Sequence, residues 1–108
     1  MTPDQRVLHA LVRLQRAAGS WALASVASVL SATLTPNLTG PVGLPPPPGA
    51  VLDDVWATGL CVAFLRTRLV RLRSEWALVE RKAVVWLTAQ PGTDLDDLLA
   101  AATGALTV

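Results

Sequence analysis

The chain has 108 residues and a net charge of +1, with 52% apolar residues against only 16% charged ones. This length fits a single domain, which at this size can bury a real core without disulfide bonds. The small net charge gives no overall field that would attract nucleic acid or an anionic membrane. The excess of apolar over charged residues predicts either a thick core or some apolar surface that a partner covers.

The first third of the chain predicts two helices. Residues 2–5 (TPDQ) form a helix start with a capping box, and apolar residues then recur at helical spacing. Gly19 is expected to end this helix. Ser20 is expected to cap a second helix that runs to about Ala32.

A proline-rich segment follows, from Thr35 to Gly49, with six prolines and three glycines. Proline lacks the N–H group that helices and central strands need, so neither is expected here. The segment is predicted to be a surface connector within a single domain of residues 1–108.

A third helix is predicted to open at Asp53 and Asp54, which lie at the positive end of its dipole, and to run to about Arg71. It contains a charge-free apolar run from Val55 to Leu65. Eleven residues are too few for a bilayer core, which needs about 20. The run therefore predicts a buried helix and no membrane span.

Two more helices complete the prediction. Ser74 is expected to cap the fourth, which Pro91-Gly92 ends, and residues 93–96 (TDLD) resemble a capping box that opens the fifth. No alternating pattern typical of a strand competes with these assignments. The expected fold is all-α, a compact bundle of about five helices.

Four tryptophans, with no tyrosine and one phenylalanine, are an unusual aromatic choice. Apolar residues on the third and fourth helices share helical faces with two of them and predict the core. These core residues are Trp56, Leu60, Val79, Ala83 and Trp86.

The other two tryptophans, Trp21 and Trp76, lie at predicted helix starts, where partial exposure is common. Interfaces are enriched in tryptophan and arginine. Because Trp76 lies near Leu72 and Arg73, these three residues are predicted to form a partner-contact cluster, with Trp21 as a second candidate.

No catalytic constellation is visible. The single histidine, His9, has no local nucleophile or paired carboxylate, and a dyad with Cys61 is an alternative that their separation cannot test. The acidic pairs and triplets at 53–54 and 94–97 suit helix starts better than a metal site. The sequence predicts no catalytic residue, no metal and no cofactor.

Cys61 has no second cysteine to pair with and lies in an apolar run, which predicts a buried structural thiol. An unpaired thiol is typical of a reducing compartment, so a cytoplasmic location is expected.

The arginines at 66, 68, 71, 73 and 81 raise the alternative of a nucleic-acid surface. At about 100° per residue, positions 66, 68 and 71 point in separate directions, and Glu75 and Glu80 lie near enough to offset them. A solvated, partly ion-paired surface is predicted, with no direct nucleic-acid contact.

Three segments, at 14–23 (LQRAAGSWAL), 56–60 (WATGL) and 75–87 (EWALVERKAVVWL), carry a family resemblance. They resemble the C-terminal helical region of intracellular proteins that begin with a vault-inter-α-trypsin domain and a von Willebrand factor A domain. The similarity is greatest to the von Willebrand factor A domain-containing protein 5 group. A more distant similarity is to the vault-interaction region of vault poly(ADP-ribose) polymerase.

The resemblance implies a non-catalytic scaffold role. In the vault polymerase this region binds major vault protein and lodges the enzyme in the vault particle, so binding to major vault protein and vault targeting are the expected functions here. The alternative is a structural C-terminal domain that packs on upstream domains of the same protein. The sequence leaves the oligomeric state open between a monomer and a weak dimer.

Overall fold

The computed structural model describes residues 2–34 and 52–106, and all regular structure in them is helical. The all-α prediction with five helices is confirmed. The predicted connector at 35–49 lies outside the described residues. The elements are α1 (Pro3–Leu14), α2 (Leu23–Leu34), α3 (Asp53–Arg68), the short 3₁₀ turn η1 (Val70–Leu72), α4 (Arg73–Thr88) and α5 (Leu95–Leu106).

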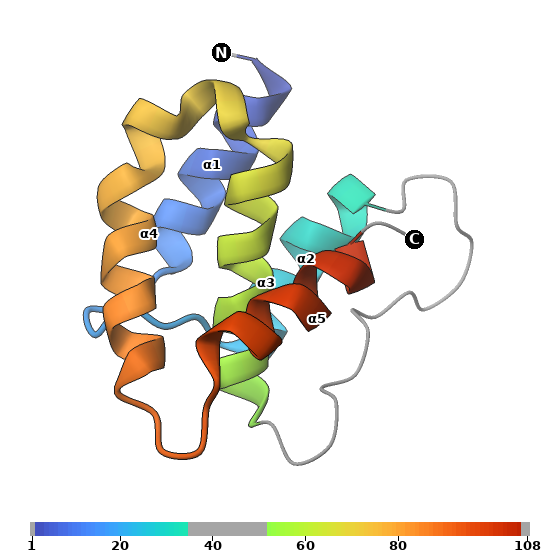
Figure 1. Ribbon diagram of the computed structural model, residues 1–108. Coiled ribbons are helices and arrows are strands. Elements are labelled where there is room, and N and C mark those ends of the chain that lie inside the picture. Colours follow the sequence, from blue (N-terminus) through green and yellow to red (C-terminus); the bar gives the residue numbers. More distant parts are fainter. Residues whose placement is uncertain (1, 35–51, 107–108) are drawn as a thin grey trace.

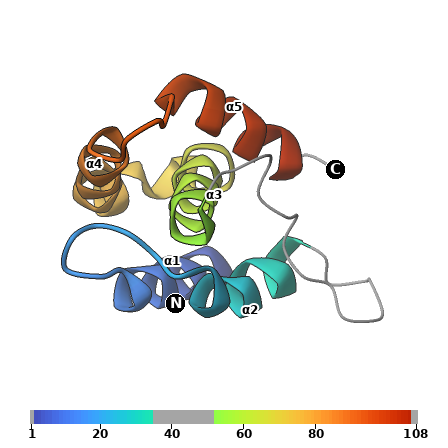
Figure 2. The same cartoon turned by 90° about the horizontal axis from the view of Figure 1, so that it is seen from below.

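Helix α3 is the centre of the fold (Figures 1 and 2), and α2, α4 and α5 pack around it. Every residue from Val55 to Leu65 is buried. A helix surrounded on all sides has no face in water, which explains why this run contains no charged residue. Among the described residues, no helix combines the length and apolarity that crossing a membrane requires.

Helix α1 starts as predicted but ends earlier. The Thr2 hydroxyl accepts from the Gln5 N–H at 3.2 Å, and the Gln5 side chain accepts from the Thr2 N–H at 2.9 Å, which completes the capping box. However, α1 ends at Leu14, and α2 begins at Leu23 rather than after a Ser20 cap. Tertiary contacts of residues 15–22, described below, outweigh the helical periodicity there.

The corner between α3 and α4 also differs from the prediction. Helix α3 ends at Arg68, and η1 runs directly into α4, so Ser74 is already helical and does not cap. The corner is instead fixed by the indole N–H of Trp76, which donates to the Leu69 carbonyl at 2.6 Å. This contact, between residues seven positions apart, replaces the predicted Ser74 cap.

Helix α5 packs closely on α3 at a glycine. A Cβ atom on Gly59 would lie only 3.0 Å from Cγ of Leu98, so glycine is what allows this approach. The cap of α5 is Asp94, whose carboxylate accepts from the Asp97 N–H at 3.1 Å. This cap lies one residue later than the predicted capping box.

Candidate protein-interaction surface

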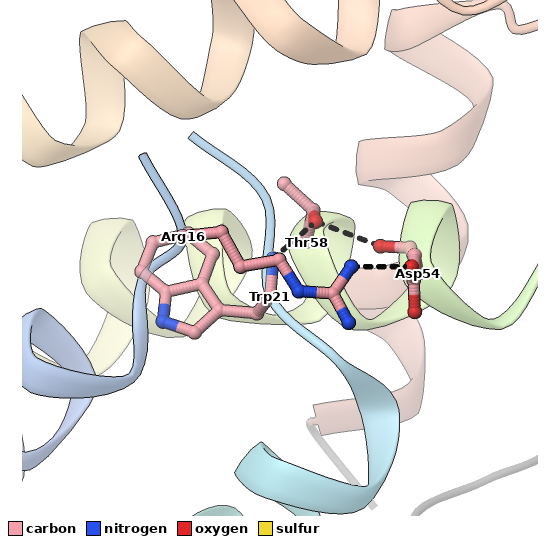
Figure 3. Close-up of polar contacts among 4 residues, drawn as sticks. All are labelled: Arg16, Trp21, Asp54 and Thr58. Atoms are coloured by element: carbon pink, nitrogen blue, oxygen red, sulfur yellow. Dashed lines mark hydrogen bonds and ion pairs between the residues drawn. The ribbon is translucent and has the colours of Figure 1, made fainter. Parts of the chain in front are cut away.

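Residues 15–22 form a loop whose tryptophan reaches the core. The Trp21 side chain is fully buried, and its indole N–H donates to the Leu11 carbonyl at 2.8 Å. Its backbone N–H donates to the Thr58 hydroxyl at 3.0 Å, which in turn donates to the Asp54 carbonyl at 2.7 Å (Figure 3). Buried polar groups need such partners, so this chain of hydrogen bonds ties the loop to α3.

The same loop contacts the backbone of α4. The side-chain amide of Gln15 donates to the carbonyls of Gly19 and Val79, both at 3.1 Å. Gly19 has φ of 109°, and a Cβ atom there would lie 2.5 Å from the Lys82 carbonyl oxygen. Only glycine fits this conformation and this approach.

The three segments that carry the family resemblance therefore meet in one place. Segment 14–23 supplies the loop, 56–60 supplies its partner on α3, and 75–87 supplies the α4 backbone beneath it. These motif residues act as structural joints of the fold. Part of the resemblance therefore reflects residues that hold the fold together.

An ion pair adds to this joint at the surface. The Arg16 guanidinium lies 2.7 Å from the Asp54 carboxylate, with 50% and 42% of the two side chains exposed (Figure 3). Exposed pairs contribute at most about 1 kcal/mol, so the buried hydrogen bonds of Trp21 matter more.

The expected exposure of Trp21 and Trp76 is wrong. Trp76 is only 3% exposed, and both indole N–H groups already donate to backbone carbonyls. They offer no surface to a partner, because the loop and the α3–α4 corner fold back over them. Leu72 is half-buried against the core, and Arg73 alone of the predicted cluster is exposed.

The predicted core residues divide into two groups. Trp56, Leu60 and Ala83 are buried, whereas Val79 and Trp86 are half-buried and pack against the core from its edge. The buried face of α4 is centred on Trp76, Ala83 and Leu87. Trp86 lies about 80° from that centre at 100° per residue, which explains its partial exposure.

The sequence reasoning missed an apolar stripe on the outer side of α4. Leu78 and Val85 are 79% and 62% exposed and lie seven residues apart, so they share one helical face. That face is about 180° from the buried one. The exposed residues Arg81 and Lys82 lie between them. We call these four residues the α4 outer stripe.

The signal for this stripe was present in the sequence. Leu78 and Val85 fall out of phase with the residues that define the core face, so each had to point away from it. Helix α4 borders the molecule on one side (Figure 1), which leaves this face open among the described residues. The stripe is the candidate interaction surface.

Among the described residues, side chains that could bind a metal or react chemically do not cluster at the α4 outer stripe. In the described part of the chain, no three histidine, cysteine or acidic side chains come close enough to hold a metal ion. His9 is exposed on α1, while Cys61 is buried in α3. Burial removes the thiol from water and raises its pKa well above the ordinary value of 9.0.

This raised pKa predicts a specific pH dependence. The unfolded chain loses the Cys61 proton near pH 9.0 while the folded chain keeps it. The stability that this group contributes is therefore complete below that pH and falls as the pH rises further. Urea titrations of the wild type and Cys61→Ala at increasing pH measure the difference. An equal alkaline loss in both would contradict the prediction.

Acidic residues partly offset the positive charge of the arginines between positions 66 and 81. The Arg66 guanidinium lies 3.1 Å from the Glu80 carboxylate, with 44% and 21% of these side chains exposed. This pair joins α3 to α4 at the surface. The absence of direct nucleic-acid contact stays a prediction.

Comparisons with known proteins find sequence similarity over most of this chain. The chain is 34% identical to human von Willebrand factor A domain-containing protein 5A over 94 residues, which cover 85% of the chain and 11% of that protein. The mouse protein of the same name is 33% identical over 98 residues, covering 89% of the chain and 12% of that protein. These matches relate the chain to the von Willebrand factor A domain-containing protein 5 group.

A more distant relative comes from Dictyostelium discoideum. A von Willebrand factor A domain-containing protein of that organism is 31% identical over 80 residues, covering 74% of the chain and 8% of the protein. The chain thus spans about a tenth of the length of these curated relatives. No family model matches the chain, and no solved structure matches it.

Proposed function

We propose that this domain is a non-catalytic protein-interaction module that binds its partner through the α4 outer stripe. The single observation that carries the proposal is the exposure of Leu78 and Val85, at 79% and 62%, in a domain that buries all four tryptophans wholly or in part. Large apolar side chains that share one exposed face are typical of a surface that a partner covers.

The partner that the resemblance favours is major vault protein. The distant similarity to the vault-interaction region of the vault polymerase supports this choice, and the two cationic residues in the stripe give it polar as well as apolar contacts. In this proposal the domain targets the protein that contains it to the vault particle in the cytoplasm.

A second candidate is a structural domain that packs on other domains of the same polypeptide. It is favoured by the length of the relatives, of which the matching region makes up only 8–12%. In this alternative the α4 outer stripe is covered by a neighbouring domain in the same chain. The two candidates use the same surface and differ in what covers it.

The test combines binding with a matched pair of surface variants. Leu78→Asp with Val85→Asp should leave the free energy of unfolding within about 1 kcal/mol of the wild type, because both side chains lie in water and each surface change costs about 0.5 kcal/mol. The same change should weaken co-sedimentation with purified vaults at least about tenfold, because it places charge in an apolar interface.

Val12→Asp is the control, because Val12 is also exposed, at 42%, but lies on α1. It should bind vaults as the wild type does. A wild-type domain that vaults do not retain would favour the structural candidate. Equal binding by all three proteins would remove the stripe from the interface.

A further inference from the structure

The surface of the molecule opposite η1 contains an acidic groove. A pocket of about 410 Å³ lies between the start of α3 and the turn from α4 into α5. It adjoins a second hollow, with which it shares Leu52, Val55 and Gln90. Val55 and Leu98 give the groove an apolar floor, and half-buried Trp86 lines its side.

Carboxylates line both sides of this groove. Asp53 and Asp54 border it from α3, and Asp94 and Asp97 border it from the start of α5. Asp54 is paired with Arg16, and Asp94 caps α5. Within the described ranges, Asp53 and Asp97 have no cationic partner, so only the helix dipoles offset their negative charge beside the apolar floor.

The opposite end of the molecule has the complementary chemistry. Because α3 and α4 run antiparallel, the η1 corner lies at the far end from the groove (Figure 1). There Val70 is 56% exposed and stands beside the exposed Arg71 and Arg73. In the described part of the chain, neither arginine forms an ion pair, and Glu75 is the single carboxylate in the first turn of α4.

These two ends cannot meet in one molecule. Helix α3 has 16 residues, which at 1.5 Å per residue separates its ends by about 24 Å. The η1 corner presents Val70 with Arg71 and Arg73, and the groove presents Asp53 and Asp97 beside its apolar floor. Because they lie so far apart, these two surfaces can contact each other only between two molecules. Every copy carries both halves, so the matching partner is always present at equal concentration.

We propose that copies of this domain associate head to tail, with Val70, Arg71 and Arg73 of one copy seated in the acidic groove of the next. The contact is heterologous, so it forms open chains unless the rotation between copies closes a ring. This association is separate from the α4 outer stripe and does not depend on what binds there.

Sedimentation of the wild type measures the association directly. At protein concentrations up to about 1 mM, a range that detects weak binding, the average mass should rise with concentration in about 50 mM salt. The association constant should fall at least tenfold in about 500 mM salt, since exposed charges are then screened. A monomer at every concentration in low salt would overturn the proposal.

Charge reversal identifies the two surfaces. Asp53→Lys with Asp97→Lys makes both ends basic, and Arg71→Glu with Arg73→Glu makes both ends acidic. Each variant alone should stay monomeric, and an equimolar mixture should associate again because opposite charges then face each other. Circular dichroism and melting confirm that each variant is folded, and Asp53→Asn with Asp97→Asn replaces the first pair if the lysines unfold it.

The stripe variant, Leu78→Asp with Val85→Asp, separates this proposal from the proposed function. It should associate head to tail as the wild type does, even where it no longer binds vaults. Association that survives both charge reversals, or that the stripe variant alone removes, would place the contact elsewhere and refute the proposal. A mixture that stays monomeric would also refute it.

Discussion

Gly19→Ala should destabilise the domain by about 2–5 kcal/mol. The positive φ of 109° costs roughly 1–2 kcal/mol for a residue with a Cβ atom. The added Cβ would also lie 2.5 Å from the Lys82 carbonyl oxygen, and relieving that overlap costs roughly another 1–3 kcal/mol. The free energy of unfolding from urea titration measures the sum.

Gly92→Ala is the matched control for this variant. Gly92 also has a positive φ, of 74°, but a Cβ atom there meets nothing within 4 Å. The Gly92→Ala variant should therefore lose only the free energy that a positive φ costs a residue with a Cβ atom, about 1–2 kcal/mol. If the two variants were equally stable, the approach of the loop to α4 would not hold the fold together as described.

Trp21→Ala should cost about 3–5 kcal/mol, the range for emptying a buried aromatic site. The side chain is fully buried, and its removal also leaves the Leu11 carbonyl without its donor. The sequence predicts Trp86 as a core residue as well, but the structure leaves it half-buried. Because Trp86 is half-buried, Trp86→Ala should cost clearly less than Trp21→Ala in the same titrations.

Trp21→Phe separates the ring from its hydrogen bond. Phenylalanine keeps most of the apolar volume but cannot donate to the Leu11 carbonyl, so it should lose an intermediate amount, about 1–3 kcal/mol. A Trp21→Ala variant that melts within a degree or two of the wild type would show that the loop is not anchored through this residue.

Structural features that depend on residues close together in the chain were predictable from the sequence. Contacts between residues far apart in the chain were not. The capping box of α1 depends on residues three apart, so its pattern was sufficient. Gly19 was expected only to end a helix. Its actual role depends on Lys82, more than 60 residues away, and no local pattern contains that contact.

The same difference between local and distant contacts explains why Trp21 and Trp76 were wrongly predicted to be exposed. Proximity to a helix start suggested exposure for Trp21 and Trp76, but the carbonyls that hold their indole groups belong to residues outside those helices. Helical spacing identified the buried face of α4 to within about one residue, which is enough to place Ala83 and too coarse for Trp86. The stripe at Leu78 and Val85 was missed, although the same helical spacing places both residues opposite the buried face.

The central claim, that the α4 outer stripe is the binding surface, is tested most directly by site-specific photo-crosslinking to purified vaults. A photoreactive residue is placed at Leu78 in one protein and at Val12 in another, because both positions are exposed and lie on different helices. We expect the residue at position 78 to crosslink to major vault protein and the one at position 12 to give no crosslink. Crosslinking from position 12 with none from position 78 would contradict the account.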